Sequence, residues 1–256
     1  MIAIILAAGQ GTRLRPLTNN KPKCLVELSK KPLLEHQLTT LKELGIHDIH
    51  VVAGYCAEQL NRADITTHFN PNYANTNMVS TLFSAESVMS GEDDLIISYG
   101  DIVYEPKVLQ TLLLCDAPIC LAVDIEWRRY WATRMDNPLA DAETLKIVDD
   151  NRIIELGKQP HSYNDIDGQY IGLIKVRADY VTQLAKAWRN MDQNAHYDGK
   201  DFLNMYMTSF LQHLIDSGWE VQAALIENGW AEVDCKEDLQ VATQFWQPRG
   251  STRNAE

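Results

Sequence analysis

The sequence has no long hydrophobic run. No stretch approaches the ~18 consecutive apolar residues that a membrane-spanning helix needs. The apolar run at residues 2–6 is too short for the core of a signal peptide, and no basic region precedes it. We therefore expect a cytoplasmic protein that does not use a membrane as its partner.

Cysteine is scarce and scattered. The chain has five cysteines, which is an odd number, and none of them forms a Cys-x-x-Cys pair. A zinc site or a disulfide framework is therefore not expected, and a reducing compartment fits this pattern best. The cysteines are Cys24, Cys56, Cys115, Cys120 and Cys235.

Basic residues are few relative to acidic ones. The chain carries 23 lysines and arginines against 35 aspartates and glutamates, so its net charge is −12. This balance argues against nucleic acid or an anionic membrane as a partner. A small anionic substrate is still compatible with it, provided that the cations gather in one pocket.

Several common catalytic motifs are missing. The glycines near the start are not followed by Lys-Ser/Thr, so there is no GxxxxGK[ST] loop, and Leu14 stands where GxGxxG needs its third glycine. The chain also has no HRD…DFG set, no GxSxG elbow and no HExxH motif. Ordinary kinases, P-loop NTPases, serine hydrolases and zinc peptidases are therefore disfavoured.

What the sequence does contain is a glycine-rich turn followed by cations. The apolar residues 2–6 predict a short buried strand. Gly9 and Gly11 follow, and glycine allows a sharp turn and a close approach of the backbone to a ligand. A strand, a glycine loop and clustered cations together predict a cradle for a polyphosphate. The cations are Arg13, Arg15, Lys21 and Lys23.

Strand and helix patterns alternate along the chain. This alternation predicts an α/β protein with a Rossmann-like, mostly parallel sheet flanked by helices. We expect one domain over residues 1–246, a small β-hairpin and helical insertion near 125–165 over the active site, and a disordered tail at 247–256. Strands are expected at 2–6, 49–53, 95–99, 119–124, 145–148, 153–156, 170–176 and 230–234, and helices at 33–44, 78–89, 106–114, 179–191, 202–216 and 236–246.

Two carboxylates stand at the ends of predicted strands, Asp101 in Tyr-Gly-Asp and Asp234 in Glu-Val-Asp. Open α/β sheets bind ligands at the carboxyl edge of their strands, where the glycine loop also lies. A carboxylate that faces a triphosphate would repel it unless Mg²⁺ lies between them. We therefore predict that both aspartates bind Mg²⁺. The alternative for Asp101 is a cap on the next helix.

Two further stretches are unusual in composition. Residues 69–77 are rich in asparagine, which predicts a loop, and their amides either read the edge of a base or serve only as turn and cap groups. Residues 127–134 combine tryptophans with arginines. Their aromatic rings either line the pocket of a second substrate or pack in the core.

These residues resemble the signature of the sugar-phosphate nucleotidyltransferase superfamily, carried here by Leu-Ala-Ala-Gly-Gln-Gly-Thr-Arg at 6–13 and Lys-Pro-Lys at 21–23. The resemblance implies a Rossmann-like fold, an NTP and Mg²⁺ as cofactor, and release of pyrophosphate. It implies catalytic roles for Arg13, Lys23 and Lys158 and metal binding by Asp101 and Asp234. Lys158 lies in Glu-Leu-Gly-Lys rather than the family's usual Glu-Lys-Pro context. The implied nucleotide-binding residues are Leu6, Ala7, Ala8, Gly9, Gly11, Thr12, Asn75, Asn77, Thr81 and Gly100.

Within this superfamily the chain is similar to the cytidylyltransferase branch, on residues 76–82 and 131–143. That likeness implies CTP and a small phosphorylated acceptor, with glutamine phosphate favoured by residues 167–173 and 204–211. Alternative acceptors are phosphocholine, which needs an aromatic cage, or a phosphonate. A sugar-1-phosphate enzyme using UTP, dTTP or GTP, and a silent nucleotide-binding module, are further alternatives. The oligomeric state stays open, including a homodimer. The expected acceptor-binding residues are Trp127, Trp131, Arg134, Glu143, Gly172, Tyr206 and Trp230.

Overall fold

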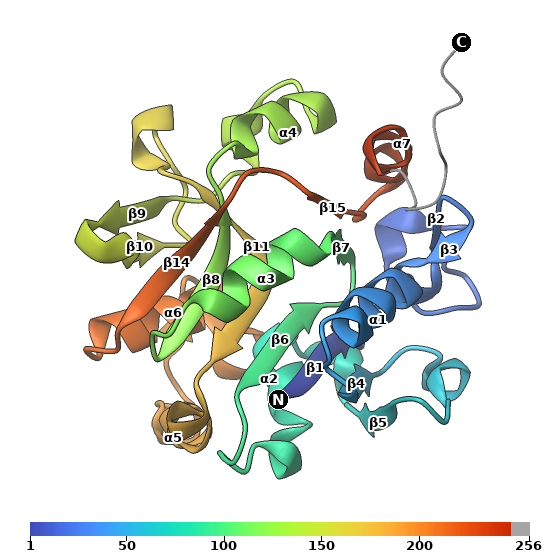
Figure 1. Ribbon diagram of the computed structural model, residues 1–256, viewed down its shortest axis with the longest axis horizontal. Coiled ribbons are helices and arrows are strands. Elements are labelled where there is room, and N and C mark those ends of the chain that lie inside the picture. Colours follow the sequence, from blue (N-terminus) through green and yellow to red (C-terminus); the bar gives the residue numbers. More distant parts are fainter. Residues whose placement is uncertain (247–256) are drawn as a thin grey trace.

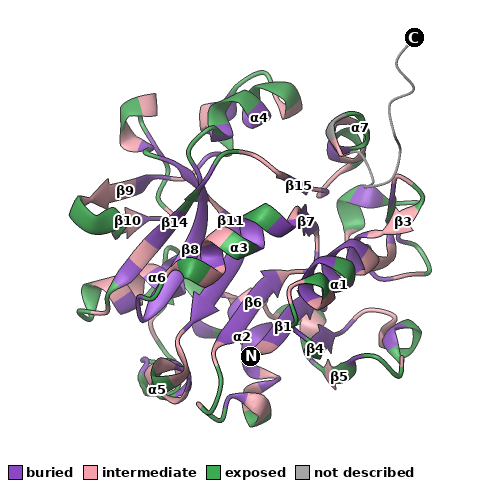
Figure 2. Cartoon of the chain, in the orientation of Figure 1, coloured by how far each residue is buried: buried purple, intermediate pink, exposed green. Residues whose placement is uncertain are grey.

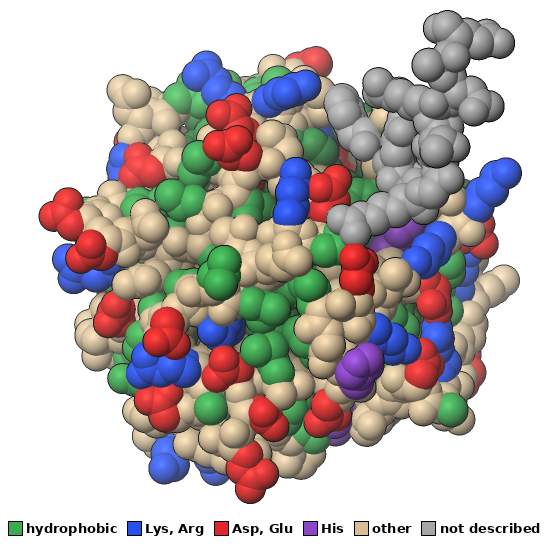
Figure 3. All heavy atoms as spheres, viewed as in Figure 1, with side chains coloured by type: hydrophobic (Ala, Val, Ile, Leu, Met, Phe, Trp, Pro, Cys, Tyr) green, Lys and Arg blue, Asp and Glu red, His purple; other side chains and the backbone are tan. Residues whose placement is uncertain are grey.

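The computed structural model describes residues 1–246 (Figure 1). The expected tail at 247–256 lies outside the described residues. Within the described part, no helix is both long enough and apolar enough to cross a membrane. Figure 3 shows basic side chains interspersed with acidic ones on the face in view, without a continuous basic patch.

A nine-stranded sheet forms the centre of the molecule, in the order β5-β4-β1-β6-β11-β8-β14-β10-β9. β11 and β10 run antiparallel to both of their neighbours, so the other seven strands point in one direction. The prediction of a mostly parallel sheet is therefore confirmed. The strands are β1 (Ile2–Ala7), β4 (Asp48–Ala53), β5 (Thr66–Phe69), β6 (Leu95–Tyr99), β8 (Ile119–Asp124), β9 (Leu145–Val148), β10 (Arg152–Leu156), β11 (Gln169–Val176) and β14 (Val221–Ile226).

Helices cover both faces of this sheet (Figure 1). Successive side chains of a strand point to opposite faces, and in β1 Ile5 belongs to one hydrophobic core while Ile4 and Leu6 belong to the other. Figure 2 shows the central strands of the sheet buried along most of their length and the helices exposed on their outer sides. The helices are α1 (Leu33–Glu43), α2 (Met78–Phe83), α3 (Pro106–Leu114), α4 (Trp127–Arg134), α5 (Ala178–Asn190), α6 (Met207–Asp216) and α7 (Lys236–Phe245).

Two expected helices are shorter than their sequence patterns. The helix expected at 78–89 ends at Phe83, and a separate 3-10 turn follows at Glu86–Val88. The helix expected at 202–216 begins only at Met207, because residues Phe202–Asn204 form a 3-10 turn capped by the side chain of Asp201. Apolar spacing continues through both turns, so periodicity alone did not mark these breaks.

The hairpin expected within the insertion is present, as β9 and β10. It does not stand apart from the sheet but forms its far edge, because Arg152 of β10 pairs with Gln222 of β14. Helix α4 is the part of the expected insertion that projects from the sheet toward α7 (Figure 1). The strand expected at 230–234 ends at Glu232.

Three short two-stranded ribbons lie outside the main sheet. One of them joins β7 (Ile102–Tyr104) to β15 (Trp230–Glu232) in antiparallel register, so that Ile102 faces Glu232 and Tyr104 faces Trp230. In the sequence, β7 directly follows β6 and β15 directly follows β14, so the ribbon joins the segments that leave these two strands of the main sheet. The other two ribbons are β2 (Glu27–Leu28) with β3 (Lys31–Pro32) and β12 (His196–Tyr197) with β13 (Lys200–Asp201).

Cys115 and Cys120 form a disulfide, with their Cα atoms 6.2 Å apart. A disulfide was not expected from the cysteine pattern, so this pair departs from that expectation. Cys115 ends α3 and Cys120 lies in β8, and the turn between these elements brings their side chains together. Cys24, Cys56 and Cys235 are free.

Candidate active site

A cavity of about 250 Å³ opens where β1 and β6 end. This is the carboxyl edge of the parallel strands, where open α/β sheets bind their ligands. Most of the residues expected to contact the nucleotide, the metal and the departing pyrophosphate line it, and the structure adds Cys24, Met78 and Tyr99. The lining residues that the sequence predicted are Leu6, Ala7, Gly9, Gly11, Thr12, Arg13, Lys23, Asn77, Gly100, Asp101 and Asp234.

The glycine loop after β1 is folded against Lys23. Gly11 has a φ of +61°, in the left-handed region that favours glycine. A Cβ at this position would lie 3.0 Å from the Cβ of Lys23. The hydroxyl of Thr18 donates a hydrogen bond to the carbonyl oxygen of Gly11 at 2.7 Å and so fixes the turn. The loop and Lys23 therefore form one unit, although eleven other residues separate Gly11 from Lys23 in the sequence.

Lys23 lies between the two predicted metal ligands. Its Nζ is 2.6 Å from Oδ2 of Asp101 and 2.5 Å from Oδ1 of Asp234. Burial on its own would lower the pKa of Lys23, but the two carboxylates outweigh burial and raise it above the usual range for lysine. Arg13 forms an ion pair with the other oxygen of Asp234. The site is therefore a compact group of two anions and two cations.

The β7–β15 ribbon explains how Asp101 and Asp234 meet. Asp101 comes directly before β7, and Asp234 lies two residues after β15. Because the strands are antiparallel, these positions lie at the same end of the ribbon, where the amide of Val233 donates to the carbonyl oxygen of Asp101 at 3.0 Å. Helix α3 is capped at Glu105 rather than at Asp101. The alternative role of Asp101 as a helix cap is therefore not observed.

Gly100 and Gln37 hold Asp101 in place. The amide of Gly100 donates to the carbonyl oxygen of Leu6 at 3.0 Å, and a Cβ on Gly100 would lie 2.6 Å from that oxygen. The fully buried Gln37 donates through Nε2 to the carbonyl oxygens of Tyr99 and Ile102, at 2.9 and 2.7 Å. Sequence reasoning missed Gln37, although a glutamine on the apolar face of a helix is a recognisable signal.

Replacing Gly100 with alanine should therefore displace the neighbouring Asp101. The added Cβ must push the Gly100–Asp101 segment away from β1, and a shift of about 1 Å can lower a catalytic rate about 100-fold. We expect that loss in kcat, together with a destabilisation of about 1–3 kcal/mol from overpacking. Thermal unfolding and steady-state kinetics measure both effects. Gly9→Ala is the control for stability, since a Cβ there meets nothing within 4 Å; equal effects on unfolding in the two variants would contradict this account.

The asparagine-rich segment contributes one side chain to the cavity, that of Asn77. Its Oδ1 also accepts the amide of Met78 at 2.8 Å and so caps α2. The Thr81 hydroxyl donates to the carbonyl oxygen of Asn77 and supports the loop from inside. Asn75 is exposed and does not line the cavity. The Ala8 side chain is buried beside the cavity, and its carbonyl oxygen accepts the amide of Tyr55.

Lys158 does not lie among the residues that line the cavity. Its side chain is 56% exposed, and Nζ pairs with Glu155 at 2.8 Å. The Lys158 backbone lies beside the segment that follows Glu143, because the amide of Thr144 donates to the carbonyl oxygen of Lys158 at 2.8 Å. The structure therefore brings Lys158 near Glu143 but not to the two aspartates.

The tryptophans expected to bind the acceptor lie in the core. Trp127, Trp131 and Trp230 are 4%, 5% and 7% exposed, and none lines the cavity. The indole nitrogen of Trp131 donates to Asp141 at 3.1 Å, and that of Trp230 donates to the buried Asp124 at 2.8 Å. In this structure the aromatic cluster therefore corresponds to the packing alternative.

Arg134 is also held away from the cavity. Its side chain is only 4% exposed, with Nη1 2.9 Å from Oε2 of Glu232 and Nε 2.8 Å from Oδ1 of Asp238. The Asp238 carboxylate also accepts the amides of Asp234 and Cys235 at 3.0 Å. Arg134 thus links α4, β15 and the first turn of α7. In the structure this arginine fastens together the segments that hold Asp234.

Glu143 is half-buried at the neighbouring edge of the site. Burial is the main cause that raises the pKa of Glu143 to about 7, and Asp141 adds to it. Gln169 positions the residue by bonding to both its amide and its carbonyl oxygen, at 3.0 and 2.6 Å. Among residues 1–246, Glu143 forms no ion pair with a lysine or arginine. A half-buried carboxylate without a cation is only partly solvated, which favours a positively charged ligand group there.

Gly172 and Tyr206 have different surroundings. Gly172 has a φ of +83°, and a Cβ there would lie 2.5 Å from the ring of Tyr99, which lines the cavity. Because Gly172 has no Cβ, the Tyr99 ring of β6 can lie against this part of β11. Tyr206 is 42% exposed, and the ammonium of Lys200 lies 5.4 Å from the centre of its ring. Neither residue lines the cavity itself.

The carboxylate pair is compatible with Mg²⁺. Oxygens of Asp101 and Asp234 converge on a single cationic group, the Lys23 ammonium. Within the described residues no group of three or more potential protein ligands exists. Mg²⁺ commonly binds through one or two carboxylates and takes its remaining ligands from phosphate and water. The two aspartates therefore fit such an ion when a triphosphate is also present.

Comparisons with known proteins agree with this geometry. Residues 3–152 match the family model of the MobA-like NTP transferase domain. The chain is 43% identical to CTP:phosphoglutamine cytidylyltransferase of Campylobacter jejuni over 94% of this chain and 98% of that protein. It is also 48% identical to choline-phosphate cytidylyltransferase of Streptococcus pneumoniae, over 32% of this chain and 38% of that protein.

A solved structure shows the same fold. The CTP:phosphocholine cytidylyltransferase of Streptococcus pneumoniae superposes with a TM-score of 0.70 at 23% identity, over 95% of this chain and 98% of that one. The family model and the Campylobacter relative confirm the predicted nucleotidyltransferase resemblance. This chain belongs to the MobA-like NTP transferase family and is a nucleotidyltransferase.

Proposed function

We propose that the protein transfers a cytidylyl group from CTP to a small phosphorylated acceptor that carries a cationic nitrogen, with glutamine phosphate favoured. The likeness to a phosphoglutamine cytidylyltransferase over nearly the whole of both chains supports this choice. The products are a CDP-linked compound and pyrophosphate. The observation that carries the proposal is the convergence of the glycine loop, Lys23 and the two aspartates on one cavity.

The chain's own groups position and neutralise the reactants. The backbone of the loop at Gly9–Thr12 holds the triphosphate, as glycine-rich turns do. A phosphate oxygen of the acceptor attacks the α-phosphorus of CTP in line, a new P–O bond forms, and the bond to pyrophosphate breaks. Lys23 and Arg13 stabilise the charge that builds on the pyrophosphate. No protein nucleophile and no covalent intermediate are needed.

Asp101 and Asp234 would hold Mg²⁺ together with the triphosphate. The ion, when bound, offsets the repulsion between carboxylates and phosphates and polarises the α-phosphate. In the structure Lys23 contacts both carboxylates, and Arg13 also pairs with Asp234. A metal ion on the two aspartates would leave the Lys23 ammonium available to the phosphate oxygens.

Glu143 is our candidate for recognising the acceptor. Phosphoglutamine and phosphocholine, the acceptors named for two relatives, both carry a cationic nitrogen, whereas a neutral sugar phosphate does not. The half-buried Glu143 carboxylate, which has no cation beside it, suits such a nitrogen. Lys158 lies on the adjoining segment and is our candidate for the acceptor's phosphate. Its exposed side chain can leave Glu155 at little cost, since surface ion pairs contribute little to stability.

A panel of substrates tests the reaction. Pyrophosphate release should require CTP, Mg²⁺ and an acceptor that has both a phosphate and a cationic nitrogen. We expect glutamine phosphate to give the highest kcat/KM and phosphocholine a lower one. Release with UTP or dTTP and a sugar-1-phosphate, but not with CTP, would contradict the proposal. Release with phosphocholine alone would keep the reaction and replace the acceptor.

The pH dependence of acceptor binding tests Glu143. Since its pKa is about 7 in the free protein, most of the carboxyl is neutral at pH 6 and charged at pH 8. A cationic acceptor binds the charged form, so its KM should fall about tenfold as pH rises through this interval. Glu143→Gln should raise KM at pH 8 and remove this difference, with kcat little changed. If KM fell equally with pH in the wild type and in Glu143→Gln, the pH dependence would come from the acceptor's own phosphate and not from Glu143.

A further inference from the structure

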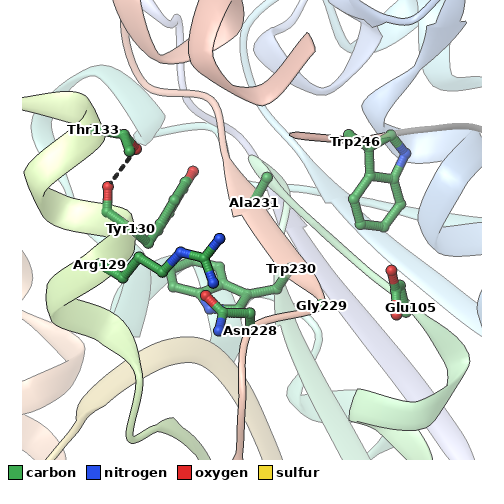
Figure 4. Close-up of a pocket in the computed structure, with 9 residues that line it drawn as sticks. All are labelled: Glu105, Arg129, Tyr130, Thr133, Asn228, Gly229, Trp230, Ala231 and Trp246. Atoms are coloured by element: carbon green, nitrogen blue, oxygen red, sulfur yellow. Dashed lines mark hydrogen bonds between the residues drawn. The ribbon is translucent and has the colours of Figure 1, made fainter. Parts of the chain in front are cut away.

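A second cavity, of about 220 Å³, lies between α4, β15 and the end of α7 (Figure 4). It shares no lining residue with the active-site cavity. Nothing in the proposed reaction uses it. Its walls nevertheless carry a distinct set of chemical groups, which are supplied by segments far apart in the sequence.

Three aromatic rings shape this cavity. Tyr130 and Trp230 pack edge to face with their ring centres 5.2 Å apart. The Trp246 indole lies across the cavity from Tyr130 (Figure 4). Its ring nitrogen donates to Nδ1 of His36 at 3.3 Å, which fixes the ring's orientation. Rings on both sides of a narrow cavity favour a flat, unsaturated ligand, because such groups pack and stack against aromatic faces.

Arg129 brings an uncompensated positive charge to one side. Its guanidinium points into the cavity, toward the side of Trp230 (Figure 4). It forms no ion pair with any residue of the described range 1–246. Other arginines of α4 are engaged: Arg128 stacks on Tyr163 with its guanidinium carbon 3.7 Å from the ring centre, and Arg134 is buried between two carboxylates. An unpaired arginine in an aromatic cavity suits a carboxylate or a phosphate.

The opposite side carries Glu105, which pairs with Lys107 at 3.2 Å. Its carboxylate can accept a hydrogen bond from a ring N–H or an amino group, and it repels a second negative charge. The amide of Asn228 lies on the side of Arg129 (Figure 4). The polar groups therefore favour a ligand with its anionic group at Arg129 and an uncharged or N–H-bearing ring edge toward Glu105.

We propose that this cavity is a second ligand site, for one aromatic ring or nucleobase that carries a single anionic group. Arg129 is opposed by Glu105 (Figure 4), which repels further negative charge, and this disfavours a nucleoside triphosphate. A nucleoside monophosphate and an aromatic carboxylate share the required chemistry. The ligand binds against Trp230, four residues before the active-site Asp234.

Binding of phenyl phosphate to the whole protein, measured by titration calorimetry, tests the site. CTP binding is measured first, because its failure would count against the proposed function and not against this second site. Phenyl phosphate is then titrated with CTP and Mg²⁺ at saturating concentrations and with no acceptor present. Phenyl phosphate should still bind once per chain, with a Kd below about 1 mM. Arg129→Ala should weaken binding at least ~10-fold through loss of the charged hydrogen bonds. Arg128→Ala, which removes the same charge from the same helix, should leave the Kd unchanged.

Two further ligands distinguish a nucleotide from an aromatic acid as the natural ligand of this cavity. CMP and benzoate are titrated under the same conditions, and the one that depends on Arg129 identifies a nucleotide or an aromatic acid. Three results would overturn the proposal: no binding of phenyl phosphate at millimolar concentration, its displacement by CTP, or an equal loss of affinity in Arg128→Ala and Arg129→Ala. Arg128 and Arg129 are both exposed, so both variants should unfold within a few degrees of the wild-type temperature.

Discussion

The Asp101→Asn variant should lose at least 99% of the catalytic rate. Asparagine keeps the size of the side chain but removes one of the two charges that converge near Lys23. Loss of one electrostatic stabiliser typically lowers kcat by about 10²- to 10³-fold. The variant should also need more Mg²⁺ for half-maximal rate, since the proposed metal ligand is weakened. Pyrophosphate release across a Mg²⁺ titration measures both effects, and chelation should abolish the wild-type activity.

Asp150→Asn is the matched control for this change. Asp150 is exposed in the β9–β10 turn and has a φ of +60°, which asparagine also tolerates. It should leave both kcat and the Mg²⁺ requirement unchanged. Turnover of Asp101→Asn at the wild-type level would remove Asp101 from the metal site. A matching loss in Asp234→Asn would support a single shared ion.

Arg134→Ala should be the most destabilising of these substitutions. It leaves the buried Asp238 and the adjacent Glu232 without their cation, and breaking a buried ion pair from one side costs about 3–5 kcal/mol. The pKa of Glu232 is already raised to about 7, chiefly by burial, and the charge of Arg134 opposes that rise. Urea unfolding at pH 7.5 measures the loss. Arg134→Lys keeps the charge but cannot contact Glu232 and Asp238 in the same way, so its loss of unfolding free energy should be intermediate.

Kinetics on the same variant separate two roles for Arg134. If the arginine bound the acceptor, as its sequence context suggested, folded Arg134→Ala at low temperature would show a raised acceptor KM with little loss of stability. The contacts with Glu232 and Asp238 predict the reverse. Arg128→Ala, which removes only an exposed stacking contact with Tyr163, should change the unfolding free energy by no more than about 1 kcal/mol.

The nucleotide end of the site could be predicted because its signals are local. Apolar residues in β1, followed by Gly9 and Gly11, fix both a buried strand and the turn at its carboxyl edge within a dozen residues. Asp101 follows β6 in the same manner. In a parallel sheet these strand ends lie side by side, so the position of each residue along its own strand was enough to place it.

The acceptor end could not be predicted in the same way. Trp131 and Arg134 have a composition that suits a binding pocket, yet both are buried against distant segments. Whether such a side chain meets a ligand or the core depends on partners such as Asp141 and Asp238. Helical spacing shows which residues share a face of α4, but it does not show what packs against that face.

The sequence by itself therefore determined the fold class, the glycine loop and the strand-end carboxylates, because these follow from the short periods of strands and turns. Only the tertiary structure decided that Asp101 and Asp234 meet on Lys23, since an antiparallel ribbon joins segments from the two halves of the chain. It also decided that Gln37 braces the site and that Arg129 faces a separate cavity. These arrangements depend on long-range packing, which no local pattern records.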